Sequence, residues 1–145
     1  MILNCVNNSS VSMPKKFLKN LTAALTKELQ SRKILNLKQA RLELTLVFLN
    51  QVPAKKLNLS FRKKNYATDV LSFPGDESQG SLGELILCPQ VLKAQAKEHD
   101  LSFQEELGYM IIHGVLHLLG YDHEKTSHQA KKMFRLQDQI FDKLC

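Results

Sequence analysis

The stretch "HGVLHLLGYDH", residues 113–123, contains three of the five histidines of the chain. His113 and His117 are four residues apart in an otherwise apolar segment, and side chains at this spacing share one face of an α-helix. Gly120 can adopt the left-handed backbone conformation that is common just past helix ends, so the chain can turn there. His123 can then approach the same point from the other side. The stretch predicts three nitrogen ligands around one metal ion.

Three protein ligands with a fourth position open to water are typical of catalytic zinc sites, because structural sites usually fill all four positions. Neutral imidazole also suits copper, nickel or iron. The alternative is that the histidines are ordinary core residues, since a pair at i and i+4 is a weak signal by itself. The third histidine after the glycine favours the metal site. His99 and His128 lie among polar residues, and we expect them to be surface residues.

The spacing HxxxHxxGxxH matches the metzincin protease pattern HExxHxxGxxH. In those proteases the glutamate after the first histidine is the general base, and here that position is Gly114. Glu106, Asp122 and Glu124 are close in sequence, but none of them occupies the required position. The pattern therefore predicts a metzincin-like zinc helix without peptidase activity.

Outward from this stretch, the sequence predicts an α+β fold, a small mixed β-sheet packed with helices. Ser102 and Glu105 form a capping-box pattern that would begin the histidine helix. "RLELTLVFLN", residues 41–50, alternates apolar and polar residues as a half-buried strand does. Further strands are expected at 2–7, 68–74 and 83–89, and helices at 13–32, 90–100 and 124–145; residues 52–65 are expected to form a turn-rich connector with a short helix after Pro53, and 75–83 a mobile loop.

The composition is typical of one globular domain, since the chain has 145 residues. Lys and Arg outnumber Asp and Glu by 20 to 14, which gives a formal charge of +6. This excess favours a polyanionic partner such as nucleic acid, although it could also serve solubility alone. The three cysteines are odd in number and widely spaced, as expected for a reduced intracellular protein. We find no signal-peptide pattern and no apolar run near the ~20 residues of a membrane span, and we expect a cytoplasmic protein.

Three blocks of the sequence together resemble the YbeY family of bacterial endoribonucleases: "HGVLHLLGYDH" at 113–123, "LNLSFRKKNYATDVLSFP" at 57–74 and "GSLGELILCP" at 80–89. The resemblance implies a single zinc-dependent endoribonuclease domain over residues 1–145. It implies single-strand-specific cleavage of RNA, at the 3′ end of small-subunit ribosomal RNA, and a role in ribosome quality control. The implied partners are ribosomal RNA and the small ribosomal subunit, with no membrane.

The resemblance also implies roles for individual residues. His113, His117 and His123 would hold one Zn²⁺ ion per chain, and Arg62 matches the essential arginine of the family. One departure is Glu84, where the family usually has aspartate. Since both are carboxylates, this leaves the expected fold unchanged and leaves open what that carboxylate does near the cleft.

The residues around Arg62 point weakly in the same direction. A guanidinium can form paired hydrogen bonds to phosphate and stabilise the charge that develops when a phosphodiester is attacked. Lys63 and Lys64 would add non-specific attraction to the backbone, and Phe61 and Tyr66 could stack on bases. The alternative is a solvated charged loop whose aromatic residues simply pack.

The expected reaction is zinc-assisted hydrolysis of an RNA phosphodiester, in which either an activated water or the ribose 2′-OH attacks phosphorus. A 2′,3′-cyclic phosphate product would indicate the 2′-OH route. Asp122 is the nearest candidate base in sequence, and it could equally orient a ligand histidine. Two other functions remain open from sequence: a ribosome-associated zinc protein that binds RNA without cutting it, and a metallohydrolase of another substrate. The missing glutamate argues against a peptide substrate.

Overall fold

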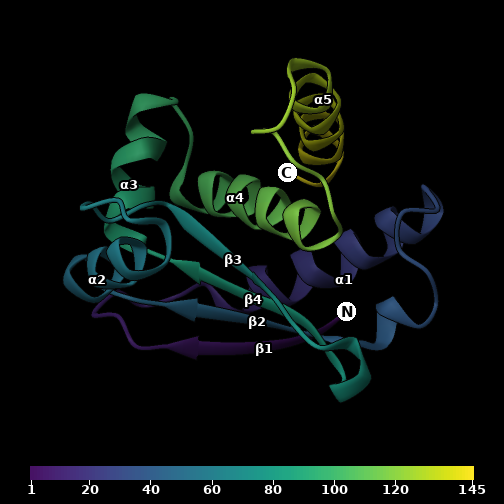
Figure 1. The fold of residues 1–145 in the computed structure, drawn as a ribbon, viewed down its shortest axis with the longest axis horizontal. Helices are drawn as coiled ribbons and strands as arrows, with labels where there is room; N and C mark the ends of the chain where they lie inside the picture. Colours follow the sequence, from purple (N-terminus) through teal and green to yellow (C-terminus); the bar gives the residue numbers. More distant parts are fainter.

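The computed structural model describes all residues 1–145, and its four-stranded sheet has the order β1-β2-β4-β3 (Figure 1). The strands are β1 (Ile2–Asn7), β2 (Glu43–Phe48), β3 (Val70–Pro74) and β4 (Ser81–Leu87). β1, β2 and β4 are parallel, whereas β3 runs antiparallel to β4. The predicted mixed sheet is confirmed.

The helices pack against this sheet as the α+β prediction requires. They are α1 (Lys15–Ser31), α2 (Gln51–Arg62), α3 (Pro89–Glu98), α4 (Phe103–Leu118) and α5 (Ser127–Leu144), with short 3₁₀ turns at Gln39–Arg41 and Glu77–Gln79. α4 runs across one face of the sheet and separates it from α5 (Figure 1). None of the helices has the length and apolar character that crossing a membrane requires.

One hydrophobic core fills the space between the sheet and helices α1, α4 and α5. The inward face predicted for β2 is confirmed, because Leu44, Leu46 and Phe48 are all fully buried, whereas Thr45, expected on the outward face, is buried as well. On α4, Leu107 and Ile111 are buried at helical spacing, as predicted. The core therefore fixes α4, and with it the first two histidines, over the sheet.

The ends of α4 follow from local sequence. The Ser102 hydroxyl accepts a hydrogen bond from the Glu105 amide at 3.1 Å, and the Glu105 carboxylate accepts one from the Ser102 amide at 2.9 Å. This is the predicted capping box, which satisfies two amides of the first turn. At the other end Gly120 has a φ of 98°, a conformation that glycine adopts without strain. The chain reverses there, as predicted.

Two sequence predictions are wrong. Residues 52–65 are not mainly a connector, because α2 begins at Gln51, before Pro53. Proline is compatible with a first helical turn, whose amides have no partner within the helix. Arg62 is therefore the last residue of a helix. Residues 75–83 are not a loop throughout, because the Asp76 side chain caps a 3₁₀ turn and β4 starts soon after it.

Candidate active site

His113 and His117 project from adjacent turns of α4, and His123 joins them from the loop that follows Gly120. One ligand nitrogen from each ring can be chosen so that all three lie within 4.8 Å of one another. His117 Nε2 and His123 Nδ1 are 3.0 Å apart. Nitrogen atoms that share a tetrahedral zinc ion lie about 3.3 Å apart, given Zn–N bonds of about 2.0–2.1 Å. The three imidazoles thus form a group that could hold one metal ion.

The surroundings of the histidines keep them suited to binding a metal. His113 Nδ1 lies 2.8 Å from Gln137 Oε1. An amide oxygen can only accept, so Nδ1 carries the proton and the lone pair of Nε2 is free. Burial lowers the pKa of His113 and of His117, and the neighbouring imidazoles lower the pKa of His117 further. Neutral imidazole is the form that binds metals, so the donor set fits a metal ion.

Sequence reasoning missed Gln137. It lies four residues after Met133 and three before Ile140, on the buried face of α5, and it is completely buried. Its Nε2 atom has no hydrogen-bond partner. A polar residue in a buried register position was the available signal, because such side chains normally have a specific partner.

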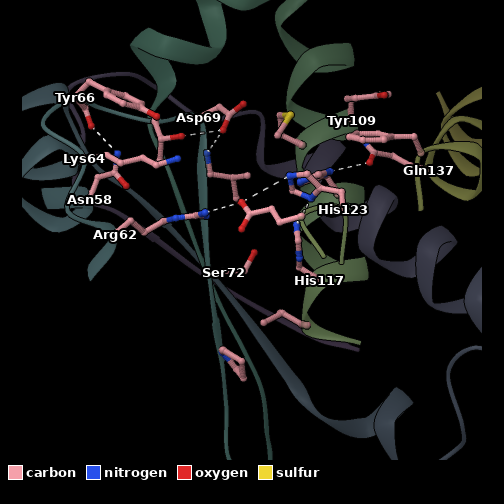
Figure 2. Close-up of a pocket in the computed structure, with 18 residues that line it drawn as sticks. Asn58, Arg62, Lys64, Tyr66, Asp69, Ser72, Tyr109, His117, His123 and Gln137 are labelled. Atoms are coloured by element: carbon pink, nitrogen blue, oxygen red, sulfur yellow. Dashed lines mark hydrogen bonds and ion pairs between the residues drawn. The ribbon is translucent and has the colours of Figure 1, made fainter. Parts of the chain in front are cut away.

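The histidines form one wall of a pocket of about 540 Å³. Figure 2 shows Asn58, Arg62, Lys64 and Tyr66 on the opposite side, with Asp69 and Ser72 of the β3 region between the two walls. The pocket therefore has a potential metal group on one side and cationic and aromatic side chains on the other.

Arg62 reaches across this pocket to the histidine loop. Its Nη2 atom donates a hydrogen bond to Glu124 Oε1 at 2.7 Å. This ion pair joins two residues that are 62 positions apart in the sequence. The side chains of Arg62 and Glu124 are 42% and 57% exposed. The hydrogen bond from the guanidinium lowers the pKa of the Glu124 carboxyl, which favours its ionised form. Arg62 is thus held beside His123 in a position that solvent and a substrate can reach.

The other predicted RNA contacts separate into two groups. Lys64 and Tyr66 line the pocket, and the Tyr66 side chain is exposed. Phe61 does not line it, because its ring packs edge-on against Phe73 at a centroid distance of 5.1 Å. Lys63 terminates α2 in a left-handed conformation with a φ of 57° and also lies outside the pocket lining.

The carboxylates singled out from sequence are not free bases in the pocket. Asp122 accepts a hydrogen bond from the Glu124 amide at 2.7 Å and does not line the pocket. Glu106 is fully buried and pairs with His99 Nδ1 at 2.9 Å, and Glu84 lies outside the lining. His99 is exposed as predicted, but it has this partner. Asp69, which sequence reasoning did not single out, lines the pocket.

The packing around Gly114 leaves little space for the glutamate that the proteases have at this position. A Cβ atom at this position would lie 2.7 Å from Leu85 Cδ2 in β4, which is closer than van der Waals contact allows. The residue after His113 therefore faces the sheet at close approach, and a glutamate there would have to displace the buried Leu85 side chain. The structure supports the sequence argument against peptidase chemistry.

Comparison with known proteins identifies the family of the chain. The family model for Endoribonuclease YbeY matches residues 4–145. The chain belongs to the YbeY family of endoribonucleases. An Endoribonuclease YbeY from Bdellovibrio bacteriovorus is 56% identical over 139 residues, which cover 96% of this chain and 92% of that one. Another, from Sulfurihydrogenibium, is 43% identical over 139 residues, covering 93% of this chain and 86% of its relative.

A solved structure agrees with this assignment. The solution structure of a Thermotoga maritima protein superimposes with a TM-score of 0.68 at 29% identity, covering 99% of this chain and 89% of that one. As a YbeY-family member the chain is a hydrolase that cleaves RNA internally, with a histidine group that could hold a metal ion. Of the functions left open from sequence, the endoribonuclease is the one that these comparisons support.

Proposed function

We propose that the chain is a zinc-dependent endoribonuclease specific for single-stranded RNA, which acts in the cytoplasm on the 3′ end of small-subunit ribosomal RNA. In this proposal His113, His117 and His123 hold the zinc ion, and Arg62 is the catalytic cation. The observation that carries it is the joint placement of three imidazoles and one arginine around a single open pocket.

The metal group has the chemistry of a catalytic site. Three imidazole nitrogens leave one position for a ligand from solvent or substrate, and no cysteine lines the pocket to complete a structural site. A zinc ion bound there would lower the pKa of a coordinated water toward ~7 and offset negative charge on a phosphate oxygen. The role of Gln137 is to fix the tautomer of His113, so that Nε2 is the nitrogen left for the ion.

Arg62 supplies the second charge that phosphodiester cleavage needs. Negative charge grows on the phosphate oxygens in the transition state, and a preorganised guanidinium stabilises that charge more than it stabilises the ground state. One nitrogen of Arg62 is engaged by Glu124, and the side chain is 42% exposed, so the remaining donors can reach a phosphate. The Glu124 contact sets the direction of the guanidinium before substrate arrives.

The pocket wall opposite the histidines fits a single strand better than a duplex. Tyr66 is 53% exposed and lines the pocket, so an unstacked base could lie on its ring. In a duplex the bases are already stacked on one another and their faces are not available. Lys64, also in the lining, adds attraction to the sugar–phosphate backbone.

Cleavage by an Arg62→Gln variant tests the assignment. Tag-free protein would be incubated with single-stranded and duplex RNA of one sequence, beside an Arg41→Gln control that removes one exposed positive charge elsewhere. We expect the wild type and the control to cut the single strand, and the Arg62 variant to lose at least about tenfold in kcat while remaining folded. Cleavage by Arg62→Gln at the wild-type rate would contradict the catalytic role of Arg62.

The product ends distinguish the two chemical routes. A 2′,3′-cyclic phosphate places the nucleophile on the ribose, whereas a linear phosphate end without a cyclic precursor places it on water. The ribosomal substrate is tested in cells that lack the chain. We expect small-subunit RNA with immature 3′ ends, corrected by the wild-type chain and not by Arg62→Gln. Mature ends in the deletion strain would refute the ribosomal assignment and leave the nuclease assignment intact.

A further inference from the structure

Two adjoining hollows lie on the other side of the loop that carries His123. Their volumes are about 760 and 560 Å³, and their linings share Arg32, Ile34, Tyr121 and Lys132. They are bounded by the C-terminal end of α1 and the residues just after it, by the loop after α4, and by the N-terminal half of α5. We call this surface the basic groove.

The lining of the basic groove is strongly cationic. Its positively charged or titratable basic residues are Arg32, Lys33, His128, Lys131, Lys132 and Arg135, and Asp122 is its only carboxylate. Lys33, Lys131, Lys132 and Arg135 are exposed, and none of them takes part in an ion pair. The groove therefore has several positive charges that the chain itself does not neutralise.

Arg32 differs from these side chains because it is held in place. Its Nε atom donates to Glu28 at 2.8 Å, and its Nη1 atom donates to Gln139 at 3.1 Å. The Gln139 contact joins the residue just after α1 to α5 across 107 positions of sequence, and the two contacts leave Nη2 of the guanidinium without a protein partner. A fixed guanidinium loses little side-chain entropy when it binds an anion.

The floor of the groove is partly apolar and aromatic. Ile34, Tyr121 and Leu136 are half-buried and pack against the core from the groove side. The Tyr121 hydroxyl forms no hydrogen bond within the chain, so the ring is anchored while its polar end is free. An aromatic floor with a cationic rim is the combination by which proteins bind single-stranded nucleic acid without reading its sequence.

One loop borders both the groove and the pocket. Tyr121 lines the groove and His123 lines the pocket, and only Asp122 separates them in sequence. Cα atoms two residues apart are at most about 7 Å from each other. An RNA strand that leaves the pocket over this loop would therefore have only a short distance to cover before it reached the groove.

We propose that the basic groove binds the sugar–phosphate backbone of single-stranded RNA on one side of the bond that is cut. The proposal rests on the proposed function, because it extends the substrate path of the same enzyme. The groove then contributes to affinity for long substrates and leaves the chemistry to the pocket.

The test removes two groove charges and measures RNA affinity against salt. The double variant Lys132→Gln, Arg135→Gln is compared with Lys16→Gln, Lys19→Gln, which removes two exposed charges from α1 outside the pockets described. The probe is a fluorescent single-stranded RNA long enough to extend past the pocket, and its dissociation constant is measured at several salt concentrations. A shorter RNA that spans the pocket alone is measured in parallel.

For single strands, each phosphate contact contributes about 0.7 to the slope of log affinity against log salt. Loss of two contacts therefore lowers the slope by about 1.4, and near 0.1 M salt it weakens binding about fivefold per contact. We expect this loss for the groove variant on the long RNA, a smaller loss on the short RNA, and no loss for the control. All substituted side chains are exposed, so equal thermal midpoints would show that folding is intact.

Equal affinity and equal salt slope for the groove variant and the control would overturn the proposal, as would the same loss on the short and long RNA. A failure of the proposed function is seen separately: in that case the wild type does not cut single-stranded RNA at all. Binding is measured without cleavage, so the groove result stands or falls independently of the cleavage result.

Discussion

Replacing Gln137 with leucine tests how the chain prepares His113 for a metal ion. Without the amide, the His113 proton can move from Nδ1 to Nε2, where water in the pocket can accept a hydrogen bond. A metal ion that binds Nε2 must then force the proton back to Nδ1, in a buried place with no acceptor. An unsatisfied buried donor costs about 1–3 kcal/mol. This penalty applies only to the metal-bound protein and not to the metal-free protein, so it lowers the affinity for the metal ion.

The penalty corresponds to roughly 5- to 150-fold in metal affinity, and loss of partners of metal-binding histidines typically costs about 10–100-fold. Metal-free Gln137→Leu should be as stable as the wild type or more stable, because the substitution also removes the unpartnered Nε2 atom. Gln137→Glu should bind metal at least as tightly as the wild type, since a carboxylate can only accept.

Competition with a chromophoric chelator measures metal affinity, and urea unfolding of the metal-free protein measures stability. Gln129→Leu is the control, because Gln129 is exposed on the same helix and does not line the histidine pocket. Unchanged metal affinity in Gln137→Leu would show that Gln137 does not prepare His113 for the metal ion. A parallel loss of affinity and of metal-free stability would show that Gln137 is only structural.

Three further predictions follow from single contacts. Glu124→Gln removes the carboxylate that holds the Arg62 guanidinium. Because an exposed ion pair is worth about 0–1 kcal/mol, RNA should bind this variant up to about fivefold more tightly in anisotropy titrations. Weaker binding of RNA would contradict this expectation. The hydrogen bond that His99 Nδ1 donates to the Glu106 carboxylate raises the pKa of His99. The stability that this pair contributes is therefore full below the ordinary histidine pKa and is lost as pH rises through the raised pKa. Thermal unfolding should therefore show a smaller decrease with rising pH in His99→Asn than in the wild type, and identical slopes would argue against the pair. Gly114→Ala places a Cβ atom 2.7 Å from Leu85 Cδ2, so urea unfolding should show a decrease of about 1–3 kcal/mol in the free energy of unfolding. An unchanged free energy of unfolding would show that α4 can shift freely at this position.

The features that sequence predicted well are local. Histidines four residues apart on an apolar helix, the Ser102 capping box and Gly120 each depend on neighbours within one or two turns. β2 was predictable because its alternation has the period of a strand with one buried face. The identity of α2 was missed because Pro53 was taken as the boundary of a helix, whereas it occupies the first turn.

The features that sequence did not predict depend on pairing between distant segments. Gln137 and His113 are 24 positions apart, and Arg62 and Glu124 are 62 apart. The local sequence around each of these four residues does not specify its partner. The first contact arises from the packing of α5 on α4, and the second from the position of α2 beside the histidine loop. The basic groove has the same origin, since its cations come from the residues just after α1 and from α5.

The most direct test of the account is the metal dependence of RNA cleavage by one tag-free preparation. The protein would be assayed as purified, after removal of metal by a chelator, and after return of Zn²⁺, with metal content measured at each stage. We expect about one zinc ion per chain in the active protein, loss of cleavage with loss of metal, and recovery of cleavage when Zn²⁺ is returned. His117→Ala should neither retain the metal nor cut RNA. Full cleavage by the metal-free protein would contradict a zinc-dependent reaction at the three histidines.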